Sequence, residues 1–417
     1  MPIPRPSSSS RAVPRHSGPL DPALPRLWIQ PHYASFNGLR AIAILLVFLV
    51  HFGHYLLPDR YTWFGWIGVD LFFVLSGFLI TGILFDSLQD PHYFRNFYIR
   101  RALRIFPIFY TFFLLLFLLT PILHLEYDKT LLFFFFYVGN LTLHFIHVNP
   151  TIISMHFHGH TIVTNIGHLW SLCVEEQFYL VWPAVIWFVR TRKRLMQICV
   201  VASIIVLLLR IYLCVHMHKD LTDEYLIRWS TYTRVDTLLV GAWFALWLRE
   251  RALSIQQLRK LAYTLLATTV PIFLLFRHML PGNSIEPFIE TFGFTLIALG
   301  GAGILLLCLD DSTLLARLLR NRYLYALGAI SYGFYFIHHL FLYEVLDLYN
   351  EYPAVHRIGP LIPFLVFGVT LLLAKLSFRY LESPFLRMKT RLAPAWVPAP
   401  SPHDPELIRL HVSEPRP

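Results

Sequence analysis

The 417-residue sequence predicts an all-α membrane protein that crosses the bilayer many times. Apolar residues make up 56% of the chain and charged residues only 14%, whereas soluble domains carry about 25% charged residues. Apolar runs of spanning length recur along the chain, each able to cross the hydrocarbon core as a helix. These observations exclude an ordinary soluble globule. The four scattered cysteines indicate neither a disulfide framework nor a zinc site.

Ten apolar runs are long enough to cross the membrane as helices. They lie at 36–57, 64–85, 105–124, 169–189, 195–215, 234–249, 261–280, 288–309, 324–346 and 360–381. An eleventh run, 131–147, is shorter. If it crossed fully, the basic cluster Arg190–Arg194 and every later basic loop would face outward. We therefore expect about ten transmembrane helices plus one re-entrant or interfacial segment, in the cell inner membrane with both termini cytoplasmic.

The composition divides the chain into three regions. Residues 1–33 are rich in proline, serine and arginine without the apolar core of a signal peptide, so we expect a disordered, basic cytoplasmic arm. Residues 34–386 would form the integral-membrane domain, and residues 387–417 a disordered, proline-rich cytoplasmic tail. The net charge of +10 comes mostly from basic residues beside the apolar runs. It indicates membrane topology and contact with anionic lipid or phosphate, not nucleic acid.

Arg40 and His51 lie in the first apolar run and are the most informative pair in the sequence. On a helix they fall within about 20° of one face and about 16 Å apart along the axis. An ionisable side chain at this depth is costly unless it faces a partner or a polar cavity, so the default interpretation is functional. The alternative is that Arg40 reaches a lipid headgroup and His51 is a hydrogen-bonded core histidine.

The second apolar run carries one carboxylate, Asp70. A carboxylate in hydrocarbon requires a counter-charge or a proton, and His51, at a similar predicted depth, is the expected partner. The alternative is a neutral Asp70 that caps a helix turn. Gly65, Gly68 and Gly77 in the same run would let neighbouring helices approach closely.

A basic cluster precedes the third run and consists of Arg100, Arg101 and Arg104. Three guanidinium groups within five residues suit a polyanionic phosphate ligand, because each can bind phosphate through two hydrogen bonds. The alternative is that the cluster serves only to determine topology.

The run that begins near residue 168 contains two adjacent carboxylates, Glu175 and Glu176. They point to different helix faces and cannot share a proton, whereas Ser171, Glu175 and Tyr179 share one face. A catalytic triad of His168, Ser171 and Glu175 is excluded, because side chains stacked along one helix cannot place a base between a nucleophile and its orienting acid. Six further polar or aromatic residues are expected to line a common cavity: Trp170, Arg234, Asp236, Ser331, Tyr335 and His338.

The loop MHFHGH places three histidines close together: His156, His158 and His160. An external loop of this kind favours adventitious metal binding over a designed site. We therefore expect no metal site and no permanently bound cofactor.

Six segments stand out in order along the chain. They are FNGLRAIAILLVFLVH, GVDLFFVLSGFLIT, FYIRRALRIFP, HLWSLCVEEQFYLVWP, RVDTLLVGA and ISYGFYFIHH. Together they resemble the membrane-bound acyltransferase family 3, whose members O-acetylate extracytoplasmic glycans. The family's motifs match Arg40 and His51, the three arginines Arg100, Arg101 and Arg104, and the segment Trp170–Tyr179. The first motif departs from the family at Asn37, where aspartate is usual.

The resemblance implies a cytoplasmic acyl-CoA donor, usually acetyl-CoA, and an acceptor hydroxyl on a glycan or lipid-linked sugar of the cell envelope or an exported polymer. Many members carry a C-terminal SGNH hydrolase-like domain, for which we expect no room in this chain.

On this basis we expect arginines to hold the CoA phosphates and His51 to act as a general base, or as a nucleophile that carries the acyl group. Asp70 or Glu176 would orient His51. A transporter or flippase of a polar lipid or glycan is the main alternative, and a non-catalytic scaffold is another. No internal repeat or pair of broken helices supports the transporter.

Overall fold

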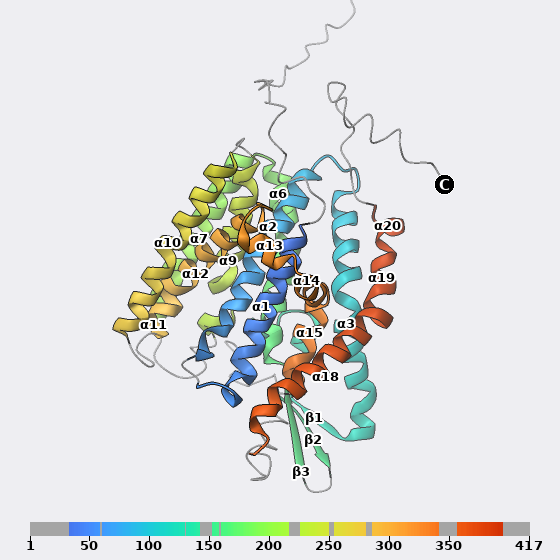
Figure 1. Cartoon of the computed structure of the whole chain (residues 1–417). Coiled ribbons are helices and arrows are strands. Elements are labelled where there is room, and N and C mark those ends of the chain that lie inside the picture. Colours follow the sequence, from blue (N-terminus) through green and yellow to red (C-terminus); the bar gives the residue numbers. More distant parts are fainter. Residues whose placement is uncertain are drawn as a thin grey trace, which may run out of the picture.

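The computed structural model describes residues 33–58, 61–129, 131–141, 152–157, 160–216, 226–249, 254–280, 286–341 and 357–394. They form a helical bundle with a small sheet at one end (Figure 1). Among these residues, eight helices are long and apolar enough to cross a membrane. The expected all-α polytopic membrane fold is therefore confirmed. Residues 1–32 and 395–417 lie outside the described part, so the predicted basic arm and most of the predicted tail stay predictions.

Eight of the ten expected runs form these long helices. The candidate spans are Ala34–Tyr55, Trp63–Asp86, Tyr93–Leu123, Gly167–Val189, Arg192–His216, Ile255–Met279, Glu286–Cys308 and Gly359–Leu392. Their main helices are α1 (Ala34–Phe52), α2 (Ile67–Asp86), α3 (Tyr93–Leu123), α6 (Trp170–Val189), α7 (Arg192–His216), α10 (Ile255–Met279), α12 (Phe294–Cys308) and α18 (Ile362–Ser377).

Short elements join and extend these helices. They are η1 (Gly53–Tyr55), η3 (Trp63–Trp66), η4 (Gly167–Leu169), α11 (Glu286–Phe288), η6 (Ile289–Gly293), α13 (Leu314–Leu319), η8 (Gly359–Leu361), η9 (Phe378–Glu382), α19 (Ser383–Arg387) and α20 (Lys389–Leu392). The last two continue from α18 and pack against α3 (Figure 1).

The other two expected runs differ from a simple span. The run 234–249 lies in α9 (Thr231–Leu248), a helix packed between α2 and α7 that carries two charged side chains. The single helix expected at 324–346 is wrong for its described part. The chain forms α14 (Arg322–Ala329), breaks at Ile330 and continues as α15 (Ser331–His338) and η7 (His339–Phe341).

The eleventh run begins with α4 (Leu131–Phe135). A helix of this length rises about 7 Å, far less than the thickness of a bilayer, so α4 itself does not cross. Residues 142–147 lie outside the described part, and the re-entrant or interfacial placement stays a prediction.

A three-stranded antiparallel sheet, which was not predicted from the sequence, lies beyond the C-terminal end of α3 (Figure 1). Its strands are β1 (Leu125–Tyr127), β2 (Ile152–Phe157) and β3 (His160–Asn165), in the order β1-β2-β3. Ile153 is paired with Tyr127 on one side and with Thr164 on the other. β3 leads directly through η4 into α6, so the sheet fixes where α6 begins.

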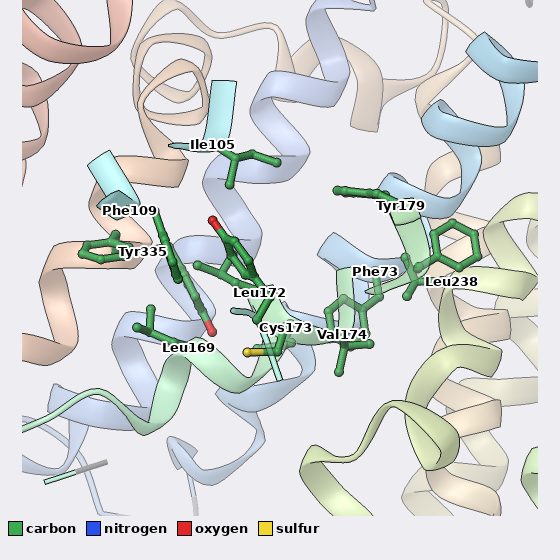
Figure 2. Packing of buried hydrophobic residues seen from close by; sticks show 14 of the residues in the cluster. Phe73, Ile105, Phe109, Leu169, Leu172, Cys173, Val174, Tyr179, Leu238 and Tyr335 are labelled. Atoms are coloured by element: carbon green, nitrogen blue, oxygen red, sulfur yellow. The ribbon is translucent and has the colours of Figure 1, made fainter. Parts of the chain in front are cut away.

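Helix α6 contributes to the larger apolar core. Figure 2 shows Leu172 and Cys173 of α6 among buried side chains of other helices, including Phe109 of α3, Leu238 of α9 and Tyr335 of α15. All five side chains are buried. The polar residues of α6 are thereby held at fixed positions against α2, α3 and α15.

Helices α2 and α9 approach each other at two glycines. A Cβ atom on Gly77 would lie 1.9 Å from the Leu238 carbonyl oxygen, and one on Gly241 would lie 2.0 Å from the Val74 carbonyl oxygen. The close helix packing predicted for Gly77 is confirmed. The same holds for Gly65 and Gly68, whose Cβ atoms would meet the backbone of α1.

This contact predicts different results for two glycine substitutions. Gly77→Ala should lower the free energy of unfolding by about 1–3 kcal/mol, because α2 and α9 must move apart. Gly368→Ala on α18 is the control, since no atom lies within 4 Å of the position that the added methyl group would take, and helix propensity favours alanine. Thermal unfolding of the purified variants in detergent measures both. Equal stability of the two variants would contradict the packing.

Candidate functional site

Polar side chains gather inside the bundle in three clusters. The arginine–glutamate cluster comprises Arg40, Arg101, Arg104, Glu175, Glu176 and Tyr179. The ion-pair network comprises Asp70, Arg210, Arg234 and Asp236. The histidine cluster comprises His51, His168, His338 and His339.

The arginine–glutamate cluster is built from α1, α3 and α6. Arg40 donates from Nη1 to the Asn37 side-chain oxygen at 2.9 Å, so the asparagine orients the arginine. The Arg101 guanidinium lies 5.7 Å from the centre of the Tyr179 ring. Arg40 interacts electrostatically with both Arg101 and Glu175. The arginines predicted near the start of the third run therefore lie beside the arginine of the first.

Arg101 and Arg104 lie inside the bundle. Helix α3 begins at Tyr93, so these residues occupy its third and later turns, about 12 Å or more from its start. The Arg101 Nε atom is buried and has no hydrogen-bond partner among the described residues. Two of the three arginines expected to form one group, Arg101 and Arg104, thus face the other residues of the arginine–glutamate cluster.

Arg100 points elsewhere and connects α3 to the end of the described chain. Its Nη1 donates to the Ala393 carbonyl oxygen at 3.0 Å. This contact brings α20 alongside, and Lys389 of α20 interacts electrostatically with Arg100, Arg101 and Arg104. Lys389 was not predicted as a site residue, because the composition after residue 386 favours a disordered tail.

The two glutamates of the cluster differ in their contacts. Glu175 accepts a hydrogen bond from Ser76 of α2 at 2.5 Å. Glu176 interacts electrostatically with Glu175 and Arg101. In the described part of the chain, the ion pairs within 4 Å do not include Arg40, Arg101 or Arg104. The positive charge of the cluster is therefore not neutralised by direct pairing, which suits an anionic ligand.

The ion-pair network links four helices. Arg234 of α9 donates from Nη2 to Asp70 of α2 at 2.7 Å. Arg210 of α7 binds Asp236 of α9 through two hydrogen bonds, at 3.0 and 2.7 Å. Arg210 also donates to Thr295 of α12 at 2.6 Å. The side chains of all four charged residues are at most 3% exposed.

This network gives each of the two charged residues of α9 a partner from another helix. Asp236 is paired with Arg210, a residue that was not singled out from the sequence, and the cavity-lining role expected for Asp236 stays a prediction. Arg234 is paired with Asp70, and its guanidinium group lies 3.6 Å from the centre of the Phe294 ring. Their geometry is that of structural ion pairs, which hold α2, α7 and α9 together.

Trp170 lies at the edge of the network. Its ring is 5.5 Å from the Arg234 guanidinium and 5.9 Å from the Phe73 ring. It is parallel to Trp229 within 3°, with ring centres 6.4 Å apart. Trp170 is half-buried, so its placement agrees with the cavity-lining role expected for it, which stays a prediction.

The histidine cluster gathers around His51 at the end of α1. The His51 ring lies 5.2 Å from the ring of His338 and 4.7 Å from that of His339. His168 of η4 stacks on His339 at 4.7 Å. His338 is fully buried and His168 and His339 nearly so. His51 and His338 were each predicted as functional residues from the sequence, but their contact was not.

Ser171 and Tyr335 border the histidine cluster. The Tyr335 hydroxyl lies 2.6 Å from Ser171 Oγ and donates to the His168 carbonyl oxygen at 2.8 Å. Ser331 is buried at the start of α15. Ser171 of α6 and Tyr335 of α15, which were expected near a common site, are therefore neighbours. Ser171 and Glu175 bond to different helices, Ser171 to α15 and Glu175 to α2. The excluded triad is absent from this part of the structure.

The expected pairing of Asp70 or Glu176 with His51 is wrong. Asp70 binds Arg234, and Glu176 lies with Arg101 and Glu175. Within the described ranges, His51 bonds instead through Nδ1 to the Val47 carbonyl oxygen at 2.9 Å and to His338 Nε2 at 3.3 Å. The role of either carboxylate in a reaction stays a prediction.

A metal centre finds no support in the described residues. No group of three or more histidine, cysteine, aspartate or glutamate residues among them is arranged to hold a metal ion. Of the loop histidines, His158 lies outside the described residues, and the side chains of His156 and His160 are not described. The expectation for that loop stays a prediction.

Three residues of the site escaped the sequence analysis: Arg210, His339 and Lys389. Arg210 carried a usable signal, because it is the one arginine in the middle of the apolar run 195–215, and such a residue requires a partner. The other two gave no such signal, since His339 follows His338 directly and Lys389 lies in a basic stretch typical of a membrane edge.

Comparison with known proteins gives one family. The family model described as "Acyltransferase domain" matches residues 33–378. No solved structure matches the chain.

Three curated relatives resemble most of the chain. Peptidoglycan O-acetyltransferase OatA of Listeria monocytogenes is 29% identical over 84% of this chain and 55% of its own length. Putative peptidoglycan O-acetyltransferase YrhL of Bacillus subtilis is 32% identical over 84% of this chain and 54% of its own length. O-acetyltransferase OatA of Staphylococcus aureus is 28% identical over 90% of this chain and 60% of its own length. The chain thus spans little more than half the length of these relatives.

The ion-pair network predicts a large loss of stability when one partner is removed. Arg210→Met should lower the free energy of unfolding by about 3–5 kcal/mol, because it leaves the Asp236 carboxylate buried without its partner. The control is Arg320→Met, which removes an ion pair to Asp311 that is 36% and 62% exposed and should change stability by less than about 0.5 kcal/mol. Thermal unfolding in detergent distinguishes them, and similar effects would show that the network is not structural.

Proposed function

Because the chain belongs to the membrane-bound acyltransferase family 3, we propose that it is an O-acetyltransferase that moves an acetyl group from acetyl-CoA to a hydroxyl of a cell-envelope glycan or lipid-linked sugar. Relatives named as peptidoglycan O-acetyltransferases support a glycan acceptor. One observation carries the proposal: helix α1 joins the arginine–glutamate cluster, through Arg40, to the histidine cluster, through His51.

The donor would bind at the arginine–glutamate cluster. CoA carries several phosphate groups, and guanidinium groups bind phosphate through paired hydrogen bonds. Among the described residues, Arg40, Arg101 and Arg104 form no ion pair that such a ligand would have to break. Lys389 adds a fourth cation. Arg100, bonded to the Ala393 carbonyl, would support this site by holding α20 in place.

The acyl group would travel along α1. Arg40 and His51 are about 16 Å apart on this helix, a distance comparable with an extended pantetheine arm and its acyl group. By the positive-inside rule, the phosphate end would lie on the cytoplasmic side of the cell inner membrane, with both termini there. The acceptor would then reach His51 from the membrane or the outer side.

His51 would act as the general base. Its Nδ1 is hydrogen-bonded, which leaves Nε2 to take the proton of the acceptor hydroxyl. The hydroxyl oxygen attacks the thioester carbonyl, the carbon–sulfur bond breaks, and the proton passes from His51 to the departing CoA thiolate. A nucleophilic His51 would form an acyl-imidazole at the same atom before the hydroxyl attacks.

Substitution of His51 tests the proposed function. His51→Gln should reduce acetyl transfer by about 10²- to 10⁴-fold, the usual contribution of a general base, while acetyl-CoA still binds. The control is His216→Gln: His216 makes the same hydrogen bond to a carbonyl four residues earlier, at 2.9 Å, but is exposed at the end of α7. Transfer of labelled acetate into glycan and binding of acetyl-CoA are measured separately. Full turnover by His51→Gln would contradict the proposal, and glycan movement that is independent of acetyl-CoA would favour a transporter.

Substitution of Lys389 tests the proposed binding site of the acetyl-CoA phosphates. Lys389→Gln should raise the KM for acetyl-CoA by about tenfold and leave kcat unchanged, because one charge-assisted hydrogen bond contributes on the order of 1.5 kcal/mol to binding. Lys193→Gln, at an exposed lysine near the start of α7, should leave KM unchanged. Equal KM values in both variants would place the phosphates elsewhere.

A further inference from the structure

The hydrogen bonds of His51 determine which of its ring nitrogens is free. Nδ1 lies 2.9 Å from the Val47 carbonyl oxygen, which can only accept. Nδ1 therefore carries the hydrogen in the neutral ring, and Nε2 keeps its lone pair. The second neighbour of Nδ1 is Nε2 of His338, at 3.3 Å.

His338 is the hydrogen-bond acceptor in its contact with His51. Its Nδ1 lies 2.6 Å from the Tyr335 carbonyl oxygen, so this nitrogen carries the hydrogen and donates. Its Nε2 is then an acceptor, and it faces the Nδ1–H group of His51. The local backbone of each histidine therefore sets the direction of the bond between them, from His51 to His338.

The other two histidines are held in the same way. His168 donates from Nε2 to the Phe336 carbonyl oxygen at 3.1 Å, and His339 donates from Nδ1 to the Asn165 carbonyl oxygen at 2.8 Å. No carboxylate among the described residues is hydrogen-bonded to any member of the cluster. Burial favours the neutral form of these four clustered imidazoles, and neutral rings are buried at less desolvation cost than a charged pair.

We propose that His338 is the positioning residue of His51, an inference that rests on the proposed function. It replaces the carboxylate that usually orients a catalytic histidine. The Val47 carbonyl oxygen and His338 Nε2 share the single Nδ1 hydrogen of His51, and both acceptors favour the tautomer whose Nε2 is free to take the acceptor proton. When His51 becomes an imidazolium, its Nδ1–H donates to His338 Nε2, which stabilises the new positive charge without a buried carboxylate.

Proton transfer within the pair is balanced. The acceptor O–H bond breaks as the N–H bond at His51 Nε2 forms, and the positive charge is shared between His51 and His338. The CoA thiolate then takes a proton from His51, which restores both neutral rings. The hydroxyl acceptor and the thioester donor supply every atom and electron pair that these steps require.

Two substitutions of His338 test the inference. His338→Ala removes the acceptor and should lower kcat at least about tenfold, a modest share of a general base's contribution, with no change in the KM for acetyl-CoA. His338→Gln places an amide oxygen near His51 Nδ1 and should recover part of the lost kcat. His216→Gln, at the exposed histidine of α7, should match the wild type. Transfer kinetics and acetyl-CoA binding are measured on purified full-length protein.

The outcomes separate this inference from the proposed function. Unchanged kcat in His338→Ala would overturn the positioning role. So would a loss of kcat and donor binding together with no recovery in His338→Gln, which would indicate a structural residue. Full turnover by His51→Gln would instead overturn the proposed function, whatever His338 does.

Discussion

The cost of burying ionisable side chains among apolar helices governs this structure. A charge at such a depth requires a partner, and the bundle meets this requirement in different ways. Asp70 and Arg234 neutralise each other across α2 and α9, and Arg210 and Asp236 do the same across α7 and α9. Because each pair spans two helices, the requirement for neutrality also fixes how the helices pack. The close contact of α2 with α9 at Gly77 then follows from both side-chain size and charge.

The two clusters that flank α1 meet the same constraint differently. Burial favours the neutral form of the histidines. Each histidine donates one hydrogen bond to a backbone carbonyl, which leaves a lone pair on the other ring nitrogen. The arginine–glutamate cluster remains charged, with Arg101 Nε buried and without a partner among the described residues. An anionic ligand would relieve that cost. A histidine site, and a cluster whose arginines form no ion pair among the described residues, are joined by one helix, and this arrangement suits the proposed acyltransferase.

Sequence alone was sufficient for features that depend on local pattern. The apolar runs predicted eight of the spans, and the spacing of Arg40 and His51 placed both on α1. It was insufficient where partners come from distant segments. His51 and His338 are 287 residues apart in the chain. Asp70 was predicted as the partner of His51 instead, because both residues were expected at a similar depth in the membrane. The break at Ile330 was also hidden, because the mostly apolar segment around it continues the helical pattern across the break. Lys389 joins the site only because α20 folds back against α3.

The most direct test of the account is to map where the acyl end of the donor lies. A photoreactive acyl-CoA analogue would be bound to the purified protein, irradiated, and the labelled peptides identified by mass spectrometry. The account predicts labelling of α1 around His51 and of α15 around His338, abolished by excess acetyl-CoA and by replacement of Arg101. Labelling confined to the exposed surface of α10, or insensitive to acetyl-CoA, would contradict a continuous path from the arginine–glutamate cluster to the histidine cluster.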